Sequence, residues 1–84
     1  MQTRKVIEGL GYTPHEAKVY LAALELGECL ATDVAQKAKL PLSSVQIILT
    51  ALHRDGLINF YTRKHHKYWV PEDPARLLAR LKLH

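Results

Sequence analysis

Hydrophobic residues in the first half of the chain recur at intervals of three and four positions, which is the spacing of amphipathic helices. The clearest helix start is Thr13, because its hydroxyl can cap the helix, Pro14 fits the first turn and Glu16 completes a capping box. Gly27 is expected to end this helix with a positive φ angle. A shorter helix is predicted before it, over residues 2–10. The predicted buried stripe of the longer helix is Ala17, Tyr20, Leu21 and Leu24.

Two further helices joined by a tight turn follow. The first of them is predicted to begin between Leu30 and Thr32 and to end near Ala38. Residues 39–42 form the turn, because Pro41 cannot continue a helix and disfavours helical backbone at the residue before it. The predicted buried residues of this short helix are Val34, Ala35 and Ala38.

The next helix is predicted to start with Ser43 as its capping residue. Gln46 lies three positions later, so the capping-box pattern is repeated. Gly56 is expected to end this helix. Its predicted buried stripe is Val45, Ile48, Leu49 and Leu52.

From Leu57 the pattern changes to β-branched and aromatic residues, which favours strands. A hairpin is predicted, with its strands and polar loop in the order 57–61, 62–66 and 67–70. A short strand over residues 29–31 is expected to pair with the edge of this hairpin. Asp73 is a predicted cap for a last helix over residues 74–83.

This order of elements predicts a mainly α fold with a small β-hairpin (α+β), namely a winged helix-turn-helix with extra terminal helices. Its 84 residues are expected to form a single domain over positions 1–84. The helix-turn-helix is expected over residues 31–55, the wing over residues 57–70 and the C-terminal helix over residues 74–83.

The positive charge is concentrated in the middle of the chain. Residues 34–71 hold six Lys or Arg side chains and one acid, Asp55, so their net charge is +5, whereas the net charge of the whole chain is +4. The remaining residues carry −1. A basic central block indicates an anionic partner.

Other classes of function find little support in the composition. Cys29 is a lone cysteine, so no intrachain disulfide can form, and we expect a buried, unreactive thiol in a cytoplasmic protein. The apolar runs are too short for a membrane span or a signal peptide. No catalytic constellation or phosphate-binding glycine loop occurs, so an enzyme and a cofactor are not expected. His65 and His66 are adjacent and would point to opposite faces of a strand, which disfavours a shared metal.

A helix followed by a basic hairpin is suited to double-stranded DNA, because the major groove admits one helix and the hairpin reaches the neighbouring backbone. In the reading helix, Gln46 could bond an adenine edge, and Ile47 or Thr50 could touch a thymine methyl group. About five phosphate contacts would give a log–log salt slope on the order of −4 to −5. The candidate DNA-binding residues are Lys37, Lys39, Ser43, Ser44, Gln46, Ile47, Thr50, Arg54, Arg63, Lys64, His65 and Lys67.

Several alternatives stay open at this point. The apolar Leu42 and Ile47 on the presumed reading surface fit a module that binds a protein partner and has little or no role on DNA. The positive charge also fits RNA or non-specific nucleic-acid binding. Ser43 fits a helix cap as well as a DNA contact. A homodimer is expected through apolar residues of the terminal helices, namely Val6, Leu10, Leu77, Leu78 and Leu81.

The sequence resembles the TrmB-type transcriptional regulators of archaea and bacteria, and more broadly the winged-helix regulators of the MarR type. The resemblance is carried by residues 10–24, which contain EAKVYLA, and by residues 40–45, 52–58 and 67–71. It implies sequence-specific transcription control in the cytoplasm, commonly by a dimer. Larger members add a C-terminal sugar-binding region, and sugar sensing is not expected for this chain. The family often has Gly where this chain has Lys39, and a basic residue where it has Leu42.

Overall fold

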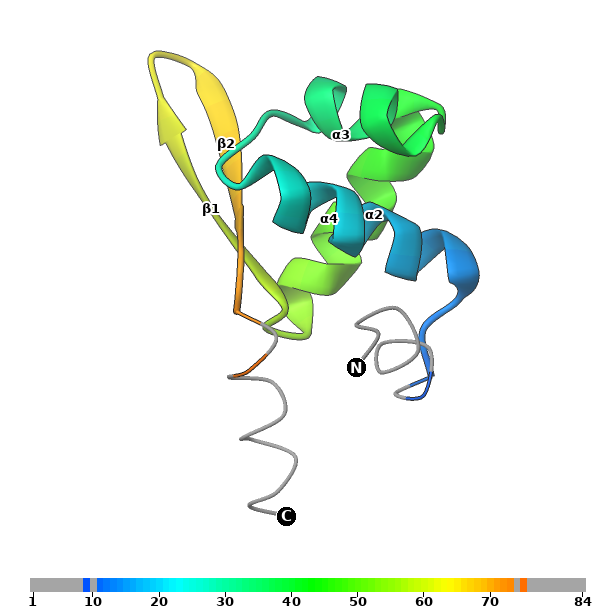
Figure 1. The fold of residues 1–84 in the computed structure, drawn as a ribbon. Coiled ribbons are helices and arrows are strands. Elements are labelled where there is room, and N and C mark those ends of the chain that lie inside the picture. Colours follow the sequence, from blue (N-terminus) through cyan, green and yellow to red (C-terminus); the bar gives the residue numbers. More distant parts are fainter. Residues whose placement is uncertain (1–8, 10, 74, 76–84) are drawn as a thin grey trace.

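The computed structural model describes residues 9, 11–73 and 75. In this part of the chain, three helices precede a two-stranded antiparallel hairpin (Figure 1). The elements are α2 (Pro14–Leu26), α3 (Ala31–Ala38), α4 (Leu42–Arg54), β1 (Ile58–Arg63) and β2 (His66–Pro71). This arrangement confirms the predicted winged-helix α+β fold. The predicted terminal helices lie outside the described residues, although Asp73 Oδ1 accepts a hydrogen bond from the backbone N–H of Ala75.

Helix α2 is the central helix of the fold. Its predicted capping box is confirmed, because the Thr13 hydroxyl accepts from Glu16 N at 3.2 Å and Glu16 Oε1 accepts from Thr13 N at 2.8 Å. Gly27 ends the helix with φ 74°. Because α2 packs against α3, α4 and β2, its buried side is wider than the predicted stripe. Leu21 and Leu24 are only half-buried, whereas Val19, Ala22 and Ala23 are buried along with Ala17 and Tyr20.

The turn between α3 and α4 corrects one prediction. Pro41, with φ −60° and ψ 143°, occupies the capping position, so α4 begins at Leu42. Ser43 is therefore the second residue of the helix, and the prediction that it caps the helix is wrong. No side-chain cap hydrogen bond forms at this end of α4. The proline ring fixes φ but allows the extended ψ of a capping residue, and this sets the helix start ahead of the serines.

Lys39 ends α3 in the left-handed conformation, with φ 58° and ψ 44°. A side chain with a Cβ atom is strained there by about 1 kcal/mol, and glycine is not. We expect Lys39→Gly to raise the free energy of unfolding by about that amount, and Tm by roughly 4–8 °C, in thermal and urea unfolding. Lys39→Ala is the matched control, because it removes the same ammonium group without relieving the backbone. Equal stability of the two variants would contradict the assignment of strain.

The hairpin also differs from its prediction. The strands extend further than expected, and Arg63 pairs with His66, so the predicted loop over residues 62–66 is wrong. The connection is a two-residue turn, Lys64-His65, with φ angles of 50° and 69°. Two consecutive positive φ angles are what a type I′ hairpin turn requires. Such turns usually contain Asn-Gly, and Lys-His lacks that signal, which is why the sequence pattern did not reveal it.

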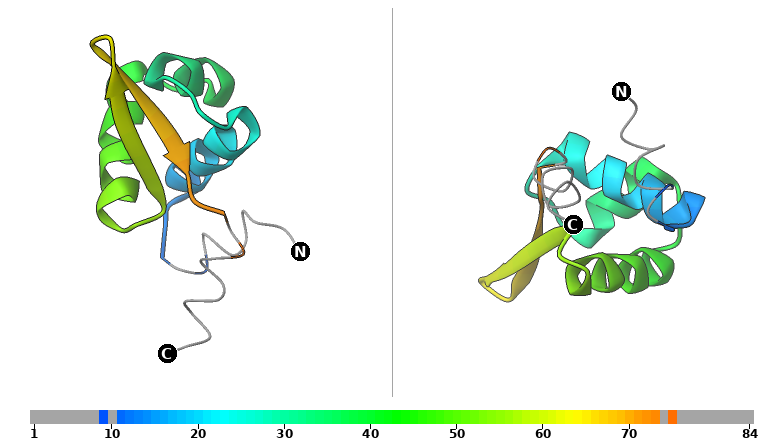
Figure 2. Two further views of the ribbon diagram at one scale, coloured as in Figure 1. Left: turned by 90° about the vertical axis from the view of Figure 1, so that its left-hand side faces the viewer. Right: turned by 90° about the horizontal axis from the view of Figure 1, so that it is seen from below.

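An isolated β-bridge joins strand β2 to the segment between α2 and α3. Cys29 N–H donates to the Trp69 carbonyl at 3.0 Å, and Trp69 N–H donates to the Cys29 carbonyl at 2.7 Å. The predicted short strand over residues 29–31 is thus reduced to one residue, because Ala31 already begins α3. Both views in Figure 2 show the hairpin tip projecting past the three helices.

The core lies between the helices and the base of the hairpin. Its largest fully buried side chains include Tyr20, Leu49, Leu52 and Ile58. The Tyr20 hydroxyl donates to the Glu72 carbonyl at 2.6 Å, which ties α2 to the end of β2. Across the described residues, no helix has the length and apolar character needed to cross a bilayer.

Two titratable groups are held in their protonated forms by the fold. Burial, with a smaller contribution from Asp33, raises the pKa of the Cys29 thiol from 9.0 to about 11. Burial and a 2.7 Å hydrogen bond to Asp55 raise the pKa of the Tyr12 hydroxyl from 10.0 to about 12. In both cases the unfolded chain loses its proton at lower pH than the folded chain does.

The contribution of these two groups to the free energy of unfolding is therefore expected to be complete below about pH 9. It should be lost as the pH rises through 11 and 12. Urea unfolding at pH 8, 10 and 11 measures this loss. Cys29→Ala should give a shallower decline between pH 9 and 11, and a decline identical to that of the wild type would contradict the role of the thiol. At pH 8 we also expect iodoacetamide to label Cys29 only slowly, because the thiol is buried and protonated.

Candidate nucleic-acid interface

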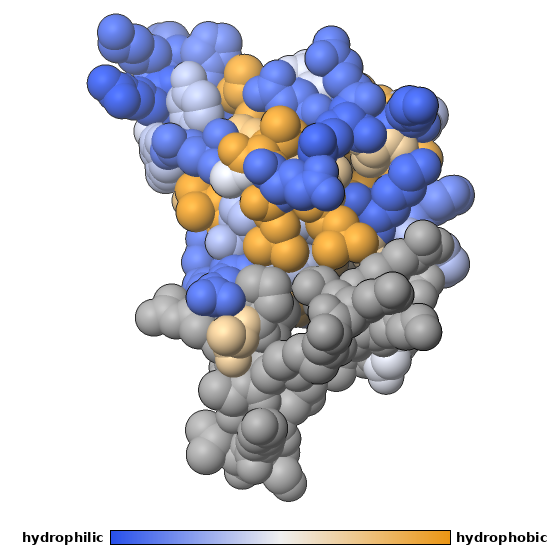
Figure 3. Space-filling model, viewed as in Figure 1, coloured by the Kyte–Doolittle hydropathy of each residue, from blue (hydrophilic) through white to orange (hydrophobic). Residues whose placement is uncertain are grey.

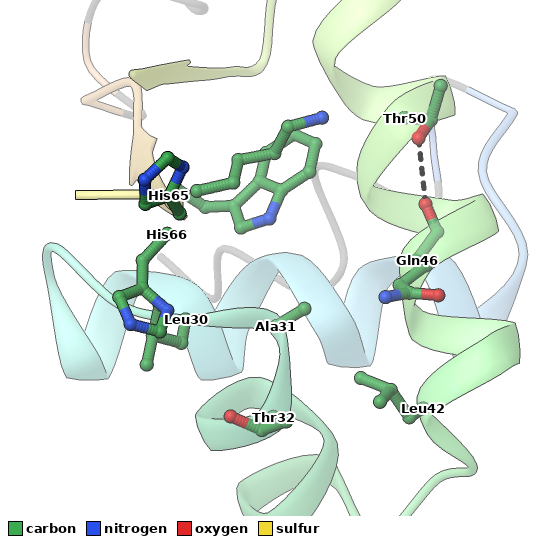
Figure 4. Close-up of a pocket in the computed structure, with 10 residues that line it drawn as sticks. Leu30, Ala31, Thr32, Leu42, Gln46, Thr50, His65 and His66 are labelled. Carbon is green, nitrogen blue, oxygen red and sulfur yellow. Dashed lines mark hydrogen bonds between the residues drawn. The ribbon is translucent and has the colours of Figure 1, made fainter. Parts of the chain in front are cut away.

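We call the β1–β2 hairpin the wing. The wing and the exposed side of α4 border one groove of about 520 Å³. Figure 4 shows Leu42, Gln46 and Thr50 on the α4 wall of this groove, with His65 and His66 on the wing side. The first residues of α3 and the residue before them close the groove between these walls. The fold thus brings the predicted reading helix and the predicted wing together around one concave surface.

The outer face of α4 carries a second, shallow depression of about 480 Å³. Its lining residues are all predicted DNA contacts, namely Ser43, Gln46, Ile47, Thr50 and Arg54. Gln46 and Thr50 line both depressions, so they lie on the ridge between them. Ile47 is 72% exposed, the highest exposure of any large hydrophobic residue in the described part of the chain. The Thr50 hydroxyl donates to the Gln46 carbonyl within the helix at 2.8 Å (Figure 4).

The wing carries its positive charge at and near its tip. Arg63, Lys64 and His65 are exposed there, and Figure 3 shows the tip covered by hydrophilic residues. Among the described residues, no acid forms an ion pair with Arg63 or Lys64. Lys67 Nζ lies 4.2 Å from the centre of the Phe60 ring and 5.1 Å from that of Trp69, so its ammonium group is held against the wing by cation–π contacts.

An aromatic cluster fixes the base of the wing against α4. The His53 ring meets Phe60 edge-on at 4.7 Å between ring centres. His53 Nδ1 lies 2.9 Å from the Ile58 carbonyl oxygen, and because a carbonyl can only accept, Nδ1 is the donor. On the opposite face of the hairpin, Tyr61 and Tyr68 stack at 5.4 Å. The contacts of His53 hold α4 against the base of the wing, and the tyrosine stack joins the two strands.

Lys37 and Lys39 are among the predicted contacts that do not line this groove. Lys37 forms an ion pair of 2.8 Å with Glu25 on α2 and lines a different groove, between α2 and α3. Its ammonium group is therefore directed toward α2, and both side chains of the pair remain partly exposed. Lys39 is exposed at the turn before α4. The predicted dimer residues, Val6, Leu10, Leu77, Leu78 and Leu81, lie outside the described residues.

Thr32 and His66 line the groove but were not among the predicted contacts. His66 was missed because it was predicted to lie in a loop. Its pairing with Arg63 instead makes it the first residue of β2, next to the wing tip. Thr32 reaches the groove only through the packing of α3, and no local sequence signal could have identified it. In the described ranges, no group of three or more His, Cys, Asp or Glu residues could hold a metal ion.

The sequence and the fold are both similar to those of known proteins. Residues 7–74 match the family model described as "Sugar-specific transcriptional regulator TrmB". The chain is 28% identical over 76 residues to the HTH-type sugar sensing transcriptional regulator TrmBL1 of Pyrococcus furiosus, an alignment that covers 90% of this chain and 22% of that protein. A solved structure of a MarR family protein from Bacillus stearothermophilus matches with a TM-score of 0.71 and 18% identity, over 94% of this chain and 57% of that one. The chain thus spans about a fifth of the curated relative and somewhat over half of the solved structure.

Proposed function

The chain belongs to the TrmB family of transcriptional regulators, and on that premise we propose that it binds double-stranded DNA with α4 in the major groove and the wing on the adjacent backbone. The observation that carries this proposal is the shared groove, because it places the exposed side of α4 beside the basic wing. A helix fits the major groove, and a neighbouring cationic hairpin fits the phosphates that flank it.

The residues of this interface divide into two groups by their chemistry. Ser43, Gln46, Ile47 and Thr50 lie on the face of α4 that meets base edges, and Ser44 is half-buried beside them. The cations that would contact phosphates are Lys39, Arg54, Arg63, Lys64 and Lys67, with His65 at the wing tip. Lys37 is left out of this set because it pairs with Glu25 and lines the groove between α2 and α3, away from α4 and the wing. Since Ser43 does not cap α4, its hydroxyl can serve a phosphate or a base.

We propose further that the protein binds as a homodimer. Two copies of α4 would then enter successive major grooves about 10 base pairs apart, so the bound sequence would be palindromic. Selection of bound duplexes from a random pool tests both statements together. A palindromic consensus supports the dimer and specific reading, whereas recovery of random sequences contradicts specific reading. Competition with a structured RNA distinguishes duplex DNA from general nucleic-acid binding.

A second candidate function is a module that binds a protein partner. It is favoured by the exposed apolar side chains on α4, where Leu42 is 39% exposed and Ile47 is 72% exposed. The two functions differ in a direct measurement. If the pure protein retards no duplex at about 50 mM salt but captures a partner through Leu42 and Ile47, this second function holds.

A further inference from the structure

We infer that α4 recognises A·T base pairs through the thymine methyl group, with Ile47 and the methyl group of Thr50 as the contacts that set this preference. The inference rests on the proposed function and specifies which bases the proposed reading helix prefers. Three observations support it, namely the hydrogen bond of Thr50, the exposure of Ile47 and the position of the cations on α4.

Thr50 has a hydroxyl group whose hydrogen is already used within the helix. The hydroxyl donates this hydrogen to the Gln46 carbonyl at 2.8 Å, so the hydrogen is not available to a base edge (Figure 4). Thr50 nevertheless lines both depressions beside α4 and is exposed. The hydroxyl oxygen can still accept from a base, whereas the methyl group is the part that can make an apolar contact. A serine at this position would keep the internal hydrogen bond and lose that methyl group.

Ile47 stands in the middle of the outer face of α4, between Ser43 and Thr50 on the same stripe. With 72% of its surface exposed, it contributes little to the core and presents an apolar group to whatever meets this face. In the major groove, the thymine C5-methyl group is the apolar feature that a side chain can contact. Burying one methyl group is worth a factor of about four in affinity.

The polar groups on this face complement the same base pair. Guanine is read most often by the fork of Arg or by Lys, and α4 carries no such residue before Arg54, its last residue. Gln46 carries an amide, which matches the donor and acceptor pattern of adenine. An A·T pair therefore offers adenine to Gln46 and a methyl group to Ile47. A G·C pair offers no partner to the apolar side chains.

The test compares duplexes that differ only in the C5-methyl group. The probes are a 24-base-pair alternating A·T duplex, the same duplex with uracil in place of thymine, and a G·C duplex with cytosine or 5-methylcytosine. Binding is measured by fluorescence anisotropy at about 50 mM salt. We expect the thymine duplex to bind about four-fold more tightly than the uracil duplex for each methyl group contacted. Methylation of cytosine should strengthen binding in the same direction.

Variants assign the methyl dependence to the protein side chains. Ile47→Ala and Thr50→Ser should reduce the ratio of thymine to uracil affinity, because they weaken binding to the thymine duplex more than binding to the uracil duplex. Thr50→Val should preserve the ratio. Leu26→Ala is the matched control, because Leu26 is a 39% exposed apolar residue on α2, outside this face. It should leave the ratio as it is in the wild type. Comparison of ratios also cancels any difference in stiffness between the duplexes.

The two levels of the proposal fail in different ways. A wild-type ratio near one, with clear binding to both duplexes, overturns the inference and leaves the proposed function standing. An equal loss of affinity for both duplexes in Ile47→Ala also overturns it, since the side chain would then act without regard to the methyl group. Absence of binding to all four duplexes at low salt overturns the proposed function, and the inference with it.

Discussion

Replacing Arg63 by Ala and Lys64 by Asn is expected to weaken binding to every duplex by roughly fifty-fold at about 0.1 M salt. The loss is independent of sequence, because the wing supplies phosphate contacts and no base contacts in the proposed complex. Asn is chosen at Lys64 because that residue has a φ angle of 50°, which Asn adopts readily in a type I′ turn. The hairpin therefore keeps its shape while it loses two charges.

The measurement is the dissociation constant over a range of salt concentrations. For the wild type, a plot of the logarithm of affinity against the logarithm of salt concentration should have a slope of about −4 to −5. For the double variant the slope should be about 2 less negative. Lys18→Ala with Lys37→Ala is the matched control, because it removes two charges from the groove between α2 and α3. That control should keep the wild-type slope. If both variants lose affinity alike, total charge rather than the wing governs binding.

Leu49→Ala is expected to lower the free energy of unfolding by about 3 kcal/mol, whereas Ile47→Ala on the same helix should change it by less than about 0.5 kcal/mol. Leu49 is fully buried in the core, and Ile47 is 72% exposed. A domain of 84 residues has a total stability on the order of 4–13 kcal/mol, so the loss at Leu49 is a large part of the whole.

Urea unfolding followed by the fluorescence of Trp69, the lone tryptophan of the chain, measures both values. Trp69 is buried beside Phe60 and His53, so it reports directly on packing at the base of the wing. The pair of variants also provides a check on the proposed interface. Ile47→Ala should alter sequence preference without altering stability, and a large destabilisation by that variant would place Ile47 in the core instead.

Local chemistry predicted much of this fold, because many of its elements are determined by adjacent residues. The capping box of Thr13 and Glu16 formed as its spacing indicates, and the burial of Val45, Leu49 and Leu52 followed from helical periodicity. One error lies at the turn before α4. The sequence pattern placed Pro41 in the turn and Ser43 at the cap of α4, but the extended backbone of Pro41 occupies the capping position and the helix begins at Leu42.

The candidate site was harder to predict, because its geometry depends on contacts between distant parts of the chain. The partner of Lys37 is Glu25, which lies on another helix and becomes a neighbour only when α2 and α3 pack together. The wing turn was hidden because Lys64 and His65 adopt positive φ angles without the usual glycine or asparagine. The hydroxyl of Thr50 could not be assigned from sequence, since its hydrogen bond depends on rotamer choice.

The separation of Ile47 from the core has a consequence for how such regulators diversify. Ser43, Gln46 and Ile47 are all exposed, and none belongs to the set of buried residues that holds the domain together. Substitutions at these positions can therefore accumulate after gene duplication without bringing the protein below the stability it needs to fold. In the proposed complex these residues face the bases, so a copy with a new target sequence can arise in single steps, each of which passes through a folded protein. On this scaffold, selection can act on target choice and on folding as independent traits.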